Sequence, residues 1–87
     1  MFKKLRFLFY RLAQQPCFVL HIHQGQIQLQ QGQVSQAFLS ACQDIVDLYA
    51  LQQGLIMGLK REEYIQLRFY DLPAKLQQNF RNIWENS

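Results

Sequence analysis

The chain has few of the residues from which metal sites, redox centres and phosphate-binding loops are built. Its 87 residues include two cysteines, Cys17 and Cys42, and neither belongs to a Cys-x-x-Cys pair or to a Cys/His cluster with metal-ligand spacing. Because a free cysteine behaves as a small apolar residue, we expect two buried, unpaired thiols in a protein of a reducing compartment. The four glycines stand apart from one another, which excludes a glycine-rich phosphate loop.

Groups suited to catalysis are equally scarce. Ser35 and Ser40 have simpler roles as a helix cap and an exposed helix position, and Asp44 and Asp47 lie on the polar side of the same predicted helix. No nucleophile has a base at a suitable spacing, and no pair of carboxylates is expected in a cleft. We therefore expect a protein that is not an enzyme and has no cofactor and no small-molecule substrate.

The chain also lacks a hydrophobic run that is long enough to cross a membrane. Within residues 1–15 no uncharged run is longer than Phe7–Tyr10, whereas a transmembrane helix needs about 20 apolar residues. The apolar residues of this segment recur at helical spacing, its four cations lie mostly elsewhere, and no acid precedes Asp44. Residues 1–15 therefore predict a basic amphipathic helix that is neither a membrane span nor a secretory signal.

Two hypotheses for this helix remain open. In the first, the helix lies in the interface of an anionic membrane, with its aromatic rings inserted and its cations at the headgroups. In the second, the helix packs on the rest of the domain or forms the contact between two subunits of a homodimer. The same residues make the contact in either case: Phe2, Lys3, Lys4, Leu5, Arg6, Leu8, Phe9 and Leu12.

Alternating and helical patterns of apolar residues divide the remaining chain into six elements. The turn Gln24–Gly25 joins the first two strands, Ser35 caps the first helix, Gln53–Gly54 closes this half of the chain, and Gly58 predicts a bulge in the third strand. In order, the elements are strands at 17–22 and 26–31, a helix at 36–49, strands at 55–60 and 63–70, and a helix that opens near Pro73.

The second half of this region repeats the first at an interval of 38 residues. Each copy has two strands and a helix, and a single copy would leave half of its apolar surface exposed. The two copies must therefore dock, either within one chain or between two chains. Equivalent positions are Ile27 and Ile65, Phe38 and Leu76, Cys42 and Phe80, Ile45 and Ile83, and Val46 and Trp84.

We predict an α+β fold in which the helix at 1–15 precedes a single ββαββα domain at 17–86, with repeats at about 17–50 and 55–86. The four strands form an antiparallel sheet, and both repeat helices pack on one of its faces. The sheet should direct Ile27, Leu29, Ile65, Leu67 and Phe69 toward the helices. The helices should present Phe38, Cys42, Ile45 and Tyr49, and Leu76, Phe80, Ile83 and Trp84.

The other face of the sheet is then uncovered and polar. Tyrosine and arginine are favoured in protein interfaces, so this face predicts contact with an unknown protein partner or with a second copy, and a merely solvated face is the alternative. A lower alternative is stacking of single-stranded RNA, which needs more cations than this nearly neutral region offers. The predicted partner face consists of His21, His23, Gln28, Gln30, Tyr64, Gln66, Arg68 and Tyr70. Its two histidines lack a third metal ligand nearby, so we expect no metal.

From residue 18 to residue 84 the chain resembles a family of short bacterial proteins that form a domain of unknown function. The features that carry the resemblance are Phe38 and Cys42 in the first helix, the pair Leu72-Pro73, and the final stretch from Leu76 to Trp84. The resemblance implies a ββαββα domain behind an N-terminal segment that resembles a membrane anchor, and it implies no activity. The segment of this chain is shorter and more charged than a span.

The function class that these observations favour is a small interaction module. We expect it in the cytoplasm, peripheral on the inner face of the cytoplasmic membrane through residues 2–13. The alternative is a soluble homodimeric protein-binding domain whose N-terminal helix lies between the subunits.

Overall fold

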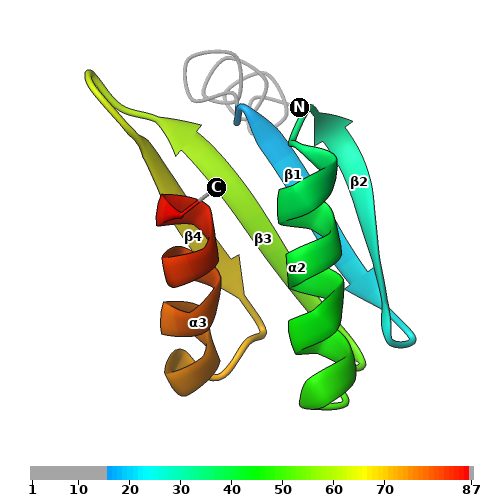
Figure 1. Ribbon diagram of the computed structural model, residues 1–87. Coiled ribbons are helices and arrows are strands. Elements are labelled where there is room, and N and C mark those ends of the chain that lie inside the picture. Colours follow the sequence, from blue (N-terminus) through cyan, green and yellow to red (C-terminus); the bar gives the residue numbers. More distant parts are fainter. Residues whose placement is uncertain (1–15, 87) are drawn as a thin grey trace, which may run out of the picture.

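The computed structural model describes residues 16–86 as a four-stranded antiparallel sheet with two helices on one face (Figure 1). The strands lie in the order β2-β1-β3-β4, so the two hairpins meet along the central strands β1 and β3. The α+β fold and the antiparallel sheet agree with the prediction. The predicted helix at 1–15, with every proposed contact from Phe2 to Leu12, lies outside the described residues. The elements are β1 (Phe18–His23), β2 (Gln26–Gly32), α2 (Gln36–Leu48), β3 (Gln53–Lys60), β4 (Ile65–Tyr70) and α3 (Ala74–Glu85).

The two hairpins close in different ways. Gln24 and Gly25 form a two-residue turn, and both have positive φ, 50° and 78°. This is the backbone of a type I′ turn, whose twist matches that of an antiparallel hairpin. The second hairpin has a longer tip, in which the Arg61 N–H donates to the Tyr64 carbonyl at 2.7 Å.

The register of the central strands relates the two ββα units by an approximate two-fold axis. Val19 of β1 lies opposite Met57 of β3, which follows it by 38 residues in the chain. The flanking pairs obey the same relation, because Phe18 lies opposite Gly58 and Leu20 opposite Ile56. The axis therefore passes between β1 and β3, and it places β2 and β4 at opposite edges of the sheet.

The two helices start at the predicted places. Ser35 caps α2, since its Oγ accepts a hydrogen bond from the Phe38 N–H at 3.1 Å. Helix α3 begins after Pro73, whose ring offers no capping hydrogen bond but suits the start of a helix. Neither α2 nor α3 is long and apolar enough to cross a membrane.

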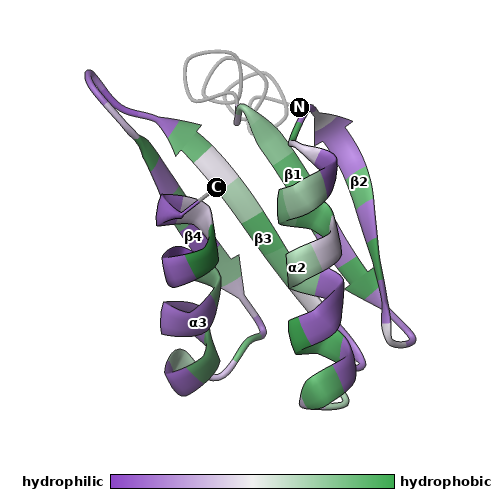
Figure 2. Cartoon of the chain, viewed as in Figure 1, coloured by the Kyte–Doolittle hydropathy of each residue, from purple (hydrophilic) through white to green (hydrophobic). Residues whose placement is uncertain are grey.

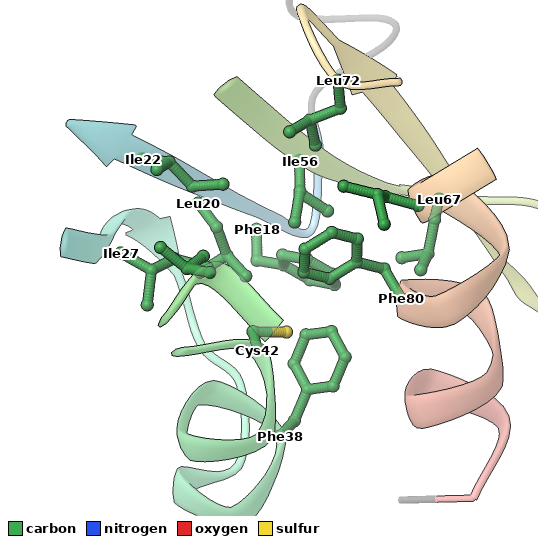
Figure 3. Packing of buried hydrophobic residues seen from close by; sticks show 12 residues of the cluster. Phe18, Leu20, Ile22, Ile27, Phe38, Cys42, Ile56, Leu67, Leu72 and Phe80 are labelled. Carbon is green, nitrogen blue, oxygen red and sulfur yellow. The ribbon is translucent and has the colours of Figure 1, made fainter. Parts of the chain in front are cut away.

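The core lies between the helices and the inner face of the sheet, and both units contribute to it (Figure 3). The Phe18 ring of β1 meets the Phe38 ring of α2 edge-on, with centroids 6.0 Å apart, and lies 5.2 Å from the Trp84 ring of α3. One aromatic side chain thus joins both helices to the sheet. The buried hydrophobic residues are Phe18, Leu20, Ile22, Ile27, Phe38, Cys42, Val46, Ile56, Leu67, Leu72, Leu76 and Phe80.

Two expectations about the core and the strand ends are wrong, and a third is correct only in part. Tyr49 is 45 % exposed because α2 ends at Leu48, and Val46 fills the buried position one turn earlier. Leu29 faces the helix side as predicted, since it lies opposite the buried Leu20, but it is 40 % exposed. Gln53 and Gly54 do not close the first unit but begin β3.

The predicted bulge at Gly58 is also wrong. Gly58 pairs regularly with Phe18 on one side and Leu67 on the other. A Cβ atom at this position would lie 2.2 Å from the Phe18 ring, so the glycine is required because the ring lies against it. The irregularity of the sheet is in β2, where Val19 pairs with Gln31 and Leu20 with Leu29, which leaves Gln30 between them without a partner.

Candidate functional site

No element of residues 16–86 covers the face of the sheet opposite the helices (Figure 1). We call this surface the open face. Side chains alternate between the two faces of a strand, so the register defines its rows. One central row consists of Gln28, His21, Leu55 and Tyr70. The neighbouring central row consists of Gln31, Val19, Met57 and Arg68.

The middle of the open face is apolar, in contrast to the polar face predicted. Val19 of β1 and Leu55, Met57 and Leu59 of β3 are half-buried there although no helix lies above them. We call these four residues the apolar stripe. Figure 2 shows that hydrophobic residues concentrate in β1 and β3, whereas the edge strand β2 is largely hydrophilic.

The predicted partner face contains no residue of β3. The signal was present in the alternation of Leu55, Met57 and Leu59 with the residues between them. The residues between them are Ile56, which is itself apolar, and Gly58, which has no side chain, so hydropathy alone did not distinguish the two faces of this strand. The central position of β3 was also unknown, and only a central strand places its residues in the middle of a face.

Most of the predicted partner-face residues do lie on the open face. They are His21, His23, Gln28, Gln66, Arg68 and Tyr70. Gln30 is displaced by the bulge, and Gln31 takes the position opposite Val19. Tyr64 precedes β4 in the hairpin tip, where it is 62 % exposed.

The two histidines lie side by side on β1. The rings of His21 and His23 are stacked, with centroids 5.8 Å apart and an interplanar angle of 23°. Residues 16–86 contain no group of three or more potential metal ligands. The pair lies beside the apolar stripe, since His21 is opposite Leu55 and follows Val19 on the same face of β1.

The open face carries little charge. Arg68 is the only permanently charged side chain in its two central rows. Polar contacts lie at the two ends of the stripe: Gln53 Nε2 donates to Asp71 Oδ2 at 2.6 Å, and Arg61 Nε donates to Gln66 Oε1 at 2.9 Å. Such a surface can bury apolar groups in its middle and form hydrogen bonds at its rim, as protein interfaces do.

The buried thiol of Cys42 is not a reactive centre. Cys42 of α2 is fully buried, and this burial raises the pKa of its thiol from 9.0 to about 12. The thiolate is the nucleophilic form, so Cys42 is protonated and unreactive at neutral pH. Cys17 is half-buried, and both cysteines are free, as expected from the sequence.

Comparison with known proteins identifies a family without a function. A family model described as "Protein of unknown function (DUF3634)" matches residues 5–87. The match includes all six elements of the domain and most of the N-terminal segment. No curated protein and no solved structure matches the chain.

Proposed function

Because the chain belongs to the DUF3634 family, whose description assigns no function, we propose a function from its surfaces. The protein is a small non-enzymatic interaction module that binds a partner protein through the open face. Residues 2–13 hold it at the inner face of the cytoplasmic membrane. The resemblance to a family of unknown function is confirmed by the match.

The apolar stripe is the observation that carries the binding role. Leu55, Met57 and Val19 lie at the centre of the sheet, away from its edges, and the described chain leaves them facing outward. Apolar groups at the centre of a patch with a polar rim are typical of protein interfaces, in which the centre supplies most of the binding free energy.

A protein partner fits the open face better than single-stranded RNA. RNA-binding sheets stack bases on aromatic rings and neutralise phosphates with several cations. In the central rows the open face has one tyrosine, Tyr70, and one permanent cation, Arg68, and its middle is aliphatic. Aliphatic side chains favour contact with apolar protein side chains.

The sequence of residues 2–13 supports the membrane role. In a helix over this segment Phe2, Leu5, Phe9 and Leu12 would share one side. The cations Lys3, Lys4, Arg6 and Arg11 have no neighbouring acid. This combination favours binding in the interface of a membrane with anionic lipids. The competing hypothesis, in which the same segment joins two subunits, predicts a dimer that forms without membranes.

The binding role is tested by substituting the stripe. In affinity capture from the native host, Met57→Lys should lose a partner that the wild-type protein retains, because a cation enters the centre of the interface. Leu48→Lys is the matched control, since Leu48 is 74 % exposed on α2 and far from the stripe in the fold. A partner lost equally in both variants, or in neither, would argue against the open face.

The membrane role is tested by sedimentation with vesicles. The full chain should sediment with vesicles of anionic lipid and stay in solution with neutral ones. The triple substitution Lys3→Glu, Lys4→Glu and Arg6→Glu should abolish sedimentation while the circular dichroism spectrum still shows a folded domain. Equal sedimentation of the triple variant, or none of the wild type, contradicts membrane binding by this segment.

A further inference from the structure

The two edge strands of the sheet are β2 and β4 (Figure 1), and they differ in the hydrogen bonds made by their outward-facing backbone groups. On β2, the Ile27 N–H donates to Oε1 of Gln43 at 2.9 Å, so a side chain from α2 occupies the edge. The Nε2 atom of the Gln43 side chain donates to the Gly25 carbonyl at 3.0 Å and to the Asp47 carboxylate at 2.9 Å. The bulge at Gln30 interrupts the edge further. A capped and bulged edge strand is protected against pairing with another chain.

The outer edge of β4 has no equivalent cap within residues 16–86. The hydrogen bond from the Arg61 N–H to the Tyr64 carbonyl sets the phase of the β3–β4 ladder, in which hydrogen-bonded and non-hydrogen-bonded pairs alternate. In this phase the even-numbered residues of β4 direct their backbone groups toward β3. The odd-numbered residues, Ile65, Leu67 and Phe69, direct theirs outward.

The residue of α3 that corresponds to Gln43 explains the open edge. It is Arg81, 38 positions later in the chain. A guanidinium donates hydrogen bonds but accepts none, so Arg81 cannot take up the Ile65 N–H as Gln43 takes up the Ile27 N–H. Arg81 lies instead over the Phe69 ring, with its Cζ 5.0 Å from the ring centroid.

A groove of about 640 Å³ follows the β4 edge on the helix side. Its apolar walls are Ile65 and Leu67 of β4 and Trp84 of α3. The charged side chains around it are Glu63, Arg81 and Glu85. A strand added at β4 would place alternate side chains in this groove and the others on the open face.

We propose that β4 pairs with β4 of a second copy of this chain, antiparallel and centred on Leu67, to form a two-fold dimer with a continuous eight-stranded sheet. The two-fold axis between the paired β4 strands can pass through a hydrogen-bonded pair of equivalent residues, and such a residue must direct its backbone N–H and C=O groups outward. Leu67 is the middle one of three such residues. On the helix side, Ile65 then lies opposite Phe69 of the second copy, and each copy covers the groove of the other.

On the open face the same register is self-complementary. Gln66 lies opposite Arg68 of the second copy, and Tyr64 lies opposite Tyr70 of the second copy. Both are non-hydrogen-bonded pairs, in which cross-strand side chains approach most closely. The register keeps the two Arg68 side chains from facing each other. It also joins the two open faces into one continuous surface.

The charges beside the groove favour a second copy over an unrelated peptide. Helix α3 runs antiparallel to β4 (Figure 1). Arg81 lies over the Phe69 ring, and Glu85, one helical turn later, lines the groove together with Ile65. Because Ile65 pairs with Phe69 of the second copy, the two-fold axis brings each Arg81 toward Glu85 of the other chain. Opposite charges placed in this way set the register of an interface.

The dimer closes on itself. Its two outer edges are both β2, and both are capped by Gln43, so growth into a fibre is blocked. Beyond the ends of β4 the register brings Asp71 toward Glu63 of the second copy. This repulsion opposes pairing, and together with the small size of a two-strand contact it predicts a weak, reversible dimer.

The first test is the mass of the full chain in solution. Sedimentation velocity over a concentration series should show a reversible equilibrium between monomer and dimer, with no larger species. A protein that remains monomeric up to millimolar concentration overturns the proposal. That is also the result expected if residues 1–15 of the same chain cover the β4 edge.

The second test examines the register with engineered cysteines in a Cys17→Ser background. Protein with Gln66→Cys mixed with protein with Arg68→Cys should form a disulfide between the two positions, identified by mass spectrometry, and neither protein alone should link as well. Gln28→Cys mixed with Gln30→Cys on the capped β2 edge is the matched control and should stay unlinked. Equal linking without mixing, or equal linking at β2, overturns the β4 register.

The third test exchanges charge. Arg81→Glu should raise the dissociation constant of the dimer about threefold or more, because two symmetric contacts are lost. Adding Glu85→Arg should restore it. A double variant that dimerises no better than Arg81→Glu alone contradicts the contact. Failure of the dimer leaves the binding role of the open face standing, because the apolar stripe lies on the central strands.

Discussion

The first ββα unit and the second share one frame and fill it with different side chains. In α2 the buried positions 38 and 42 hold a large phenylalanine and a small cysteine, whereas the equivalent positions of α3 hold Leu76 and Phe80. All four side chains are buried in a single core. The comparison teaches that one close-packed core can be filled by side chains of different size at positions related by the two-fold axis.

The edges differ in the same manner. Within residues 16–86, Gln43 caps the edge of the first unit, and Arg81 at the equivalent position of the second unit does not. A single change of side-chain chemistry, from an amide that accepts hydrogen bonds to a guanidinium that does not, separates a protected edge from one suited to pairing. The two units thus have one architecture and two different surfaces.

The largest expected difference between the units is in the core. Phe80→Ala should lower the free energy of unfolding by about 3–5 kcal/mol, because it removes a fully buried ring and leaves a cavity. Cys42→Ala, at the equivalent position, should lower it by about 1 kcal/mol. Urea denaturation followed by circular dichroism measures both. Equal losses of stability in the two variants would contradict the expectation that Phe80 fills more of the core than Cys42.

Gly58 tests the packing across the central strands. Gly58→Ala should lower the free energy of unfolding by about 1–3 kcal/mol, because the new Cβ would lie 2.2 Å from the Phe18 ring. Combining it with Phe18→Leu should cost less than the sum of the two single substitutions, since a smaller side chain relieves the overlap. Additive losses in a denaturation experiment would contradict this cause.

Exchanging the edge residues should reverse the difference between the edges. Gln43→Arg should lower the free energy of unfolding by about 1–2 kcal/mol through lost hydrogen bonds and should speed hydrogen exchange at the Ile27 amide. Arg81→Gln should slow exchange at the Ile65 amide and weaken dimerisation. Exchange is measured by NMR in dilute monomer. Equal protection of Ile27 and Ile65 in the wild-type protein would remove the contrast.

The smallest effect at neutral pH belongs to the Cys42 thiol. Folding raises the pKa of this acid from 9.0 to about 12, so the folded state holds the proton more tightly than the unfolded state. The contribution of this thiol to the free energy of unfolding is fully present below pH 9, and it is lost as the pH rises toward about 12. The loss should stay below about 1 kcal/mol up to about pH 9.5. Cys42→Ala should remove this alkaline dependence, and an unchanged pH profile would contradict it.

Local patterns of the sequence were enough to predict most of the elements. Alternation in residues 26–31, helical spacing behind Ser35 and the turn at Gln24–Gly25 each depend on a few neighbouring residues. The predicted partner face was incomplete because it depended on contacts far apart in the chain. The bulge at Gln30 and the place of Leu55, Met57 and Leu59 follow from strand pairing.

The sequence by itself determined the order of strands and helices, their caps and turns, and the apolar side of each helix, because backbone conformation and amphipathicity are set by near neighbours. Tertiary structure alone decided that β1 and β3 meet at the centre, that the apolar stripe lies on the face opposite the helices, and that Gln43 reaches Ile27 while Arg81 lies over Phe69. The physical reason is that a residue's period places it on a face, but only the pairing of distant strands determines what lies beside it.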